Sequence, residues 1–137
     1  MSIPSCTASL RLFTRSIWKL TGSGRRLDDA LSLLDDEFVV HAVWDVPYSG
    51  DYFGPTGFLE LVTKISEMLE LMPSPKLQFL AYGDKVVLHY RLMFTARASG
   101  ESVEMSMAEV FTVQEGLIME LDVFYKNPSA VEALLAR

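Results

Sequence analysis

In the segment from residue 103 to residue 113, every odd-numbered residue is apolar except one acid, Glu109. Side chains point to opposite faces along a strand, so the odd-numbered residues should share one buried face. These residues are Val103, Met105, Met107, Glu109, Phe111 and Val113. A carboxylate on such a face must find a partner, meet water in a cavity or stay protonated. Because enzymes use such acids to exchange protons at neutral pH, Glu109 is a candidate catalytic residue.

Length and composition limit the classes of protein that this chain can represent. Its 137 residues fit one domain, and its net charge of −6 argues against general nucleic-acid binding. No apolar run approaches the ~20 residues of a membrane span. The single cysteine, Cys6, excludes an internal disulfide, and the histidines His41 and His89 lack a third metal ligand at recognisable spacing. We therefore expect a cytoplasmic protein without a metal or other cofactor.

The first 27 residues differ in charge from the rest, with five basic side chains and no acid. This pattern fits either an organelle transit peptide or a first helix that lies over an acidic body. Apolar residues recur at helical spacing, which favours the helix and places it over about residues 7–21. They are Leu10, Phe13, Ile17 and Leu20.

The remaining periodicities predict an α+β domain over residues 1–137. Gly and Pro mark the turns, and Pro55 suits the first turn of a long helix whose apolar stripe reaches Met72. Long hairpins with few parallel crossovers indicate helices packed on one face of a curved antiparallel sheet. The expected order is helix 27–34, strand 37–44, loop 45–54, helix 55–72, strands 76–82, 85–97, 102–113 and 117–125, and helix 128–136. The turn at 114–116 resembles a three-residue hairpin loop.

Three segments, residues 35–41, 47–55 and 109–125, resemble the nuclear transport factor 2-like superfamily. Within it they are most similar to SnoaL-like polyketide cyclases and ketosteroid isomerases, and the likeness covers about residues 8–127. The resemblance implies a cone-shaped α+β barrel, with a curved antiparallel sheet wrapped around helices and a mostly apolar pocket at its mouth. It also implies a homodimer. Members isomerise ketosteroids, close polyketide rings, dehydrate or open epoxides, and others bind ligands or only dimerise.

The resemblance assigns roles to two residues. His41 falls where ketosteroid isomerases carry the aspartate that moves the proton, and Glu109 falls where they carry the acid that hydrogen-bonds the substrate oxygen. Histidine in place of a carboxylate departs from the family pattern and argues against steroid isomerisation itself. The resemblance does not identify an equivalent of the tyrosine that binds the oxyanion in ketosteroid isomerases. The candidates by location are Tyr48, Tyr52, Tyr90 and Tyr125.

Each candidate also has a plain structural interpretation. Glu109 could be a structural acid paired with Arg91 or with a buried tyrosine, and His41 could be a satisfied core histidine. Asp45 is an alternative base if His41 points outward. Trp44, Tyr48, Tyr52, Phe58, Met107 and Tyr125 are expected to contact the substrate.

The sequence therefore predicts a SnoaL-like enzyme that moves protons on an apolar, oxygenated small molecule related to polyketides or steroids. Isomerisation, cyclisation and dehydration are the expected outcomes, with His41 as general base and Glu109 as acid. The alternative is a module of the same fold that binds a small ligand without catalysis, or that serves only to dimerise.

Overall fold

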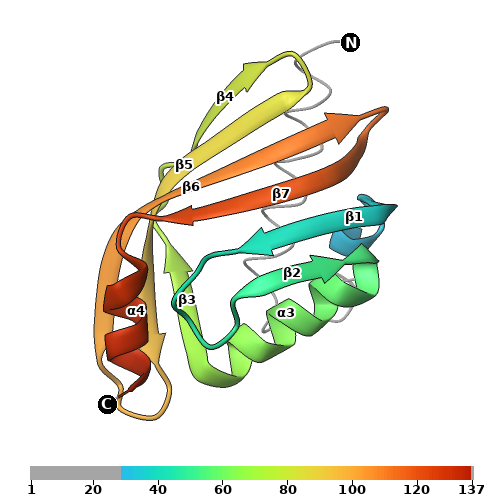
Figure 1. The fold of residues 1–137 in the computed structure, drawn as a ribbon. Coiled ribbons are helices and arrows are strands. Elements are labelled where there is room, and N and C mark those ends of the chain that lie inside the picture. Colours follow the sequence, from blue (N-terminus) through green and yellow to red (C-terminus); the bar gives the residue numbers. More distant parts are fainter. Residues whose placement is uncertain (1–28, 137) are drawn as a thin grey trace.

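The computed structural model describes residues 29–136, so the helix expected over residues 7–21 and Cys6 lie outside the described part. Seven strands form one strongly curled sheet in the order β2-β1-β7-β6-β5-β3, with β4 also paired to β5 (Figure 1). The α+β expectation is confirmed. The strands are β1 (Leu34–Ala42), β2 (Gly50–Phe53), β3 (Leu69–Pro73), β4 (Gln78–Tyr82), β5 (Lys85–Ala96), β6 (Ser102–Gln114) and β7 (Leu117–Tyr125), and the helices are α3 (Gly54–Met68) and α4 (Pro128–Leu135).

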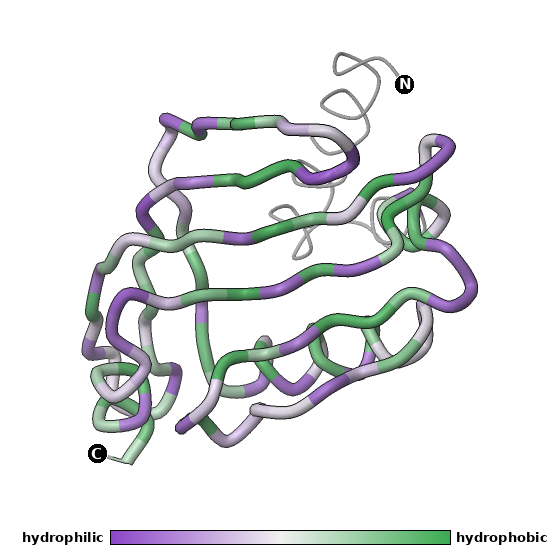
Figure 2. Tube along the Cα trace, turned by 45° about the horizontal axis from the view of Figure 1, so that its top comes forward, coloured by the Kyte–Doolittle hydropathy of each residue, from purple (hydrophilic) through white to green (hydrophobic). Residues whose placement is uncertain are grey.

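The four predicted strands of the C-terminal half are present and join as antiparallel neighbours. Residues Glu115 and Gly116 alone form the β6–β7 turn, with φ angles of 52° and 80°. The expected three-residue loop is therefore wrong, and the two left-handed residues form the kind of turn that suits the strand twist. Figure 2 shows how hydrophilic and hydrophobic residues alternate along these strands.

Two segments differ from the predicted elements. The long helix ends at Met68 rather than Met72, and Leu69–Pro73 becomes strand β3 paired with β5. Leu69 is 1% exposed there and Met72 is 70% exposed, so strand pairing, which places Leu69 in the core, outweighs the helical stripe. Gly50–Phe53, expected within a loop, pairs with β1 as strand β2.

The core lies between the concave face of the sheet and helix α3. Phe58 of α3 packs edge-on against Phe38 of β1, with ring centroids 5.8 Å apart and planes at 82°. Both side chains are buried, and removal of such a ring costs about 3–5 kcal/mol. β1 also pairs in parallel with β7, so the first described strand lies beside the last one. This pairing brings residues near 40 and near 122 together. Neither α3 nor α4 is long and apolar enough to cross a membrane.

Candidate functional site

Glu109 lies on the concave face of the sheet, where the sequence places it. It stands opposite Leu88 of β5, and Tyr90 is its diagonal neighbour two residues farther along that strand. The Tyr90 hydroxyl donates a hydrogen bond to Oε2 of Glu109 at 2.5 Å. Burial raises the pKa of Glu109 from 4.5 to about 7, although the Tyr90 hydrogen bond acts in the opposite direction. The acid can therefore gain or lose a proton near neutral pH.

A second polar pair lies on the same concave face. The hydroxyls of Tyr48 and Tyr125 are 2.8 Å apart, and the Tyr52 hydroxyl donates to the backbone oxygen of Tyr48 at 2.9 Å. Burial raises the pKa of Tyr48 to about 12 and holds that of Tyr125 well above its usual value. The charge of Glu109 raises the pKa of Tyr125 further. The Tyr125 hydroxyl therefore stays protonated and can donate a hydrogen bond.

We call Glu109, Tyr90, Tyr125 and Tyr48 the inner polar set. Its four members face an otherwise apolar surface that includes Met107, a residue only 2% exposed. A carboxyl group that titrates near neutrality suits proton transfer, and neutral phenols can stabilise negative charge on a ligand oxygen. The arrangement has the components of an acid/base site.

His41 lies on the opposite face of the sheet. Val40 points into the core, so its neighbour His41 faces outward. Its Nδ1 is 2.8 Å from Oδ1 of Asp51 and its Nε2 is 2.7 Å from Oε2 of Glu120. The hydrogen bond to Asp51 raises the pKa of His41 most strongly and that to Glu120 adds to it, while burial partly opposes both. The structure therefore does not bring His41 and Glu109 together.

The other predicted site residues occupy different positions. Asp45 is exposed in the β1–β2 loop with a left-handed φ of 65°, and Trp44 beside it is 81% exposed. Tyr52 and Phe58 are buried where β1, β2 and α3 meet. Of the predicted substrate contacts, Met107 and Tyr125 share the concave face with Glu109, and the hydroxyl of the loop residue Tyr48 contacts that of Tyr125.

The partner of Glu109 is the buried tyrosine rather than the arginine. Arg91 points outward and its Nε donates to Oε1 of Glu104 at 2.7 Å. The sequence alone indicates a buried tyrosine as one possible partner but does not identify Tyr90 as that residue. Its apolar strand face, combined with the short turn between β5 and β6, is the sequence signal that could have paired it with Glu109.

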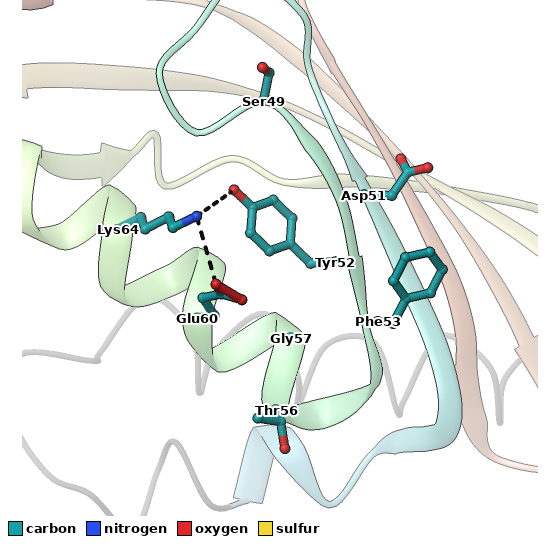
Figure 3. Close-up of a pocket in the computed structure, with 8 residues that line it drawn as sticks. All are labelled: Ser49, Asp51, Tyr52, Phe53, Thr56, Gly57, Glu60 and Lys64. Atoms are coloured by element: carbon teal, nitrogen blue, oxygen red, sulfur yellow. Dashed lines mark hydrogen bonds and ion pairs between the residues drawn. The ribbon is translucent and has the colours of Figure 1, made fainter.

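Two surface depressions are lined by described residues. One, of about 550 Å³, lies between β2 and α3, where Lys64 Nζ is 3.5 Å from the Tyr52 hydroxyl and 3.7 Å from Glu60 (Figure 3). The other, of about 490 Å³, lies at the ends of β1 and β7 and reaches Tyr125. Within residues 29–136, no group of three or more His, Cys, Asp or Glu side chains is arranged to hold a metal ion.

The strongly curled sheet with its helices has the fold of nuclear transport factor 2-like proteins. The SnoaL-like domain model matches residues 21–121, so the chain belongs to the SnoaL-like family. No curated protein matches the sequence.

Solved structures show the same fold at low sequence identity. A nuclear transport factor 2-like protein from Burkholderia xenovorans LB400 has a TM-score of 0.82 and 17% identity, covering 100% of this chain and 97% of its own. A candidate polyketide cyclase from Xanthomonas campestris pv. campestris has a TM-score of 0.80 and 13% identity, covering 96% and 97%. TerC, co-crystallised with polyporic acid, has a TM-score of 0.75 and 15% identity, covering 94% and 98%.

Proposed function

We propose that the protein binds an apolar, oxygenated small molecule, related to polyketides or steroids, on its concave face and moves protons on it without a cofactor. The observation that carries this proposal is the Glu109–Tyr90 hydrogen bond on an apolar face, with the pKa of Glu109 raised to about 7. Membership of the SnoaL-like family supports it, as does the structural likeness to a candidate polyketide cyclase and to a protein solved with polyporic acid.

In this mechanism Glu109 serves as both base and acid. Its ionised carboxylate takes a proton from a carbon next to a carbonyl group, and the protonated acid returns that proton to another atom of the substrate. Return to a different carbon isomerises the substrate, whereas return to a leaving hydroxyl group dehydrates it. Attack of the enolate on a second carbonyl carbon, followed by protonation of the new alkoxide, closes a ring.

The phenols have two separate roles in the proposal. Tyr125, kept protonated by its high pKa, donates a hydrogen bond to the substrate carbonyl oxygen as negative charge develops there. Tyr90 holds the Glu109 carboxylate in place through its hydrogen bond. The general-base role of His41 stays a prediction. The proposed mechanism does not use it, because its imidazole faces away from the inner polar set. Asp45 is likewise exposed and outside that set.

Thermal unfolding with a panel of apolar ketones, epoxides, phenols and polyketide-like aromatics would identify a ligand. A ligand at ~100 times its dissociation constant stabilises the folded protein by ~2.7 kcal/mol. Turnover of each ligand found is then compared between wild type, Glu109→Gln and Glu104→Gln. Glu104 is a matched control, because it lies on the same strand but faces outward. Wild-type turnover by Glu109→Gln would contradict the proposal.

A binding module without catalysis is the second candidate function. The observation that favours it is that Glu109 already accepts a hydrogen bond from Tyr90, so the acid is satisfied without any substrate. In that case ligands would stabilise the fold but undergo no reaction, and Glu109→Gln would change affinity alone.

We also propose that the protein forms a homodimer. Large apolar side chains are exposed on the outer strands, with Met72 70%, Leu80 64% and Tyr82 83% exposed. Contiguous exposed apolar surface commonly marks an interaction site. Light scattering after size-exclusion chromatography should give twice the monomer mass of 15.4 kDa, and Leu80→Asp should reduce it. A monomer at high micromolar concentration would contradict the proposal.

A further inference from the structure

A cleft opens where β1 and β7 stop pairing. The two strands run in parallel up to the pair His41–Asp122 and then separate. The space has a volume of about 490 Å³, and residues of both strands and of the adjoining β2 line it. This volume falls within the ~300–1,000 Å³ typical of small-molecule sites. The cleft is therefore large enough for a small organic ligand.

The two acidic side chains that line this cleft differ in whether they have a bonding partner. Its lining contains His41, Asp51 and Asp122 but neither Lys nor Arg among the described residues. Asp51 already has a partner, because its Oδ1 is 2.8 Å from Nδ1 of His41. Asp122 is partly buried, and its side-chain carboxylate makes no hydrogen bond or ion pair with the part of the chain that the structure describes. A partly desolvated carboxylate without a partner favours a cation beside it.

Aromatic rings supply the second recognition element. Trp44 is 81% exposed and Phe124 is 50% exposed, and both line the cleft together with Tyr125. Ring faces attract cations, and tryptophan does so most strongly. Aromatic walls and a free carboxylate together match a positively charged group with apolar substituents.

An organic cation fits this cleft better than a metal ion does. Both ring nitrogens of His41 are engaged by carboxylates, at 2.8 Å and 2.7 Å, so neither is free to bind a metal. No metal-binding cluster is found among residues 29–136. We propose that the cleft binds a small organic ammonium ion, whose positive group contacts Asp122 and Trp44. This site goes beyond the proposed function, because it needs neither Glu109 nor turnover.

Choline and its uncharged carbon isostere 3,3-dimethylbutan-1-ol test this proposal as a matched pair, because they differ in the positive charge. We expect choline to bind at least about tenfold more tightly in calorimetric titrations of the purified protein. The indole N–H resonance of Trp44, assigned by its loss in Trp44→Phe, should shift with choline. Equal affinity for the two probes would overturn the proposal, as would no choline binding at about 20 mM.

Two variants localise the effect. Asp122→Asn and Trp44→Ala should each weaken choline binding by about fivefold or more. Glu67→Gln, which removes one exposed acid from helix α3, should leave it unchanged and controls for the change in net charge. If choline affinity were the same in wild type, Asp122→Asn and Trp44→Ala, the site would not be in this cleft. Trp44→Ala keeps the test valid if Asp122→Asn fails to fold, since Trp44 is largely exposed.

Discussion

Glu109 on the concave face and His41 on the outer face both have a raised pKa, and the physical causes of the two shifts are opposite. Glu109 lies among apolar side chains with the neutral donor Tyr90, so burial penalises its charged form. His41 is 32% exposed in its side chain and lies between Asp51 and Glu120, so hydrogen bonds favour its charged form. The cause of a pKa shift, and not its direction, therefore distinguishes a desolvated carboxyl group from a solvated ion-pair cluster.

The largest expected effect is on catalysis, and it applies to the concave face alone. With a confirmed substrate, Glu109→Gln should lower kcat by about 10²–10³, because the amide cannot exchange the proton. Steady-state kinetics measure this loss, with Glu104→Gln as the outward-facing control. Equal losses in the two variants would show that the two faces do not differ in function.

The next effect is on stability and pH. The carboxyl pKa of Glu109 is about 7 in the folded protein against 4.5 unfolded, so the stabilisation by its proton is fully present below pH 4.5. It is lost as the pH rises to about 7, and the loss amounts to about 3 kcal/mol of unfolding free energy.

Urea unfolding of wild type and Glu109→Gln at pH 5 and pH 8 measures this difference. The variant should become more stable relative to wild type at the higher pH, because its amide does not ionise. A difference between the two proteins that does not change with pH would mean that Glu109 is not desolvated.

Removal of the Tyr90 hydroxyl should produce a smaller change. Its hydrogen bond lowers the pKa of Glu109, so Tyr90→Phe should raise that pKa further. The low-pH limb of the pH–rate profile, which reports ionisation of the Glu109 base, should then move to higher pH. Loss of the hydrogen bond should cost about 1 kcal/mol of stability. If this limb did not move in Tyr90→Phe, the Tyr90 hydroxyl would not be bonded to the group that titrates.

The smallest effect is expected on the outer face. His41→Gln should change the unfolding free energy by less than about 1 kcal/mol, because the ion pairs are solvent-accessible. Because the pKa of His41 is raised in the folded protein, the stabilisation by its proton is fully present below pH 6.5. It is lost as the pH rises through the folded-state pKa. Chemical unfolding at pH 6 and pH 9 measures it. A large fall in turnover in the folded variant would instead support His41 as the general base.

The alternation of residues 103–113 was sufficient to predict the strand, its buried face and the unusual setting of Glu109. Period-2 patterns are strong signals when one face is buried, since a one-residue slip would expose the whole apolar set. The sequence does not decide whether Arg91 or a tyrosine is the partner of Glu109, because that depends on the register between β5 and β6 and on which face of β5 turns inward.

Other features depended on tertiary pairing that no local pattern contains. Leu69–Pro73 continues a helical stripe in sequence, yet pairing with β5 makes it a strand. Asp51 and Glu120 are distant from each other in sequence, and only the β1–β2 and β1–β7 contacts place both beside His41. The carboxylate pair around His41 was therefore beyond prediction.

The most direct test of the central claim is a carbon-13 NMR titration of the Glu109 side-chain carboxyl, assigned by its loss in Glu109→Gln. We expect a midpoint near pH 7, well above the ordinary glutamate value of 4.5. A midpoint near 4.5 in the folded protein would contradict the claim that the concave face holds a carboxyl group able to exchange protons at neutral pH.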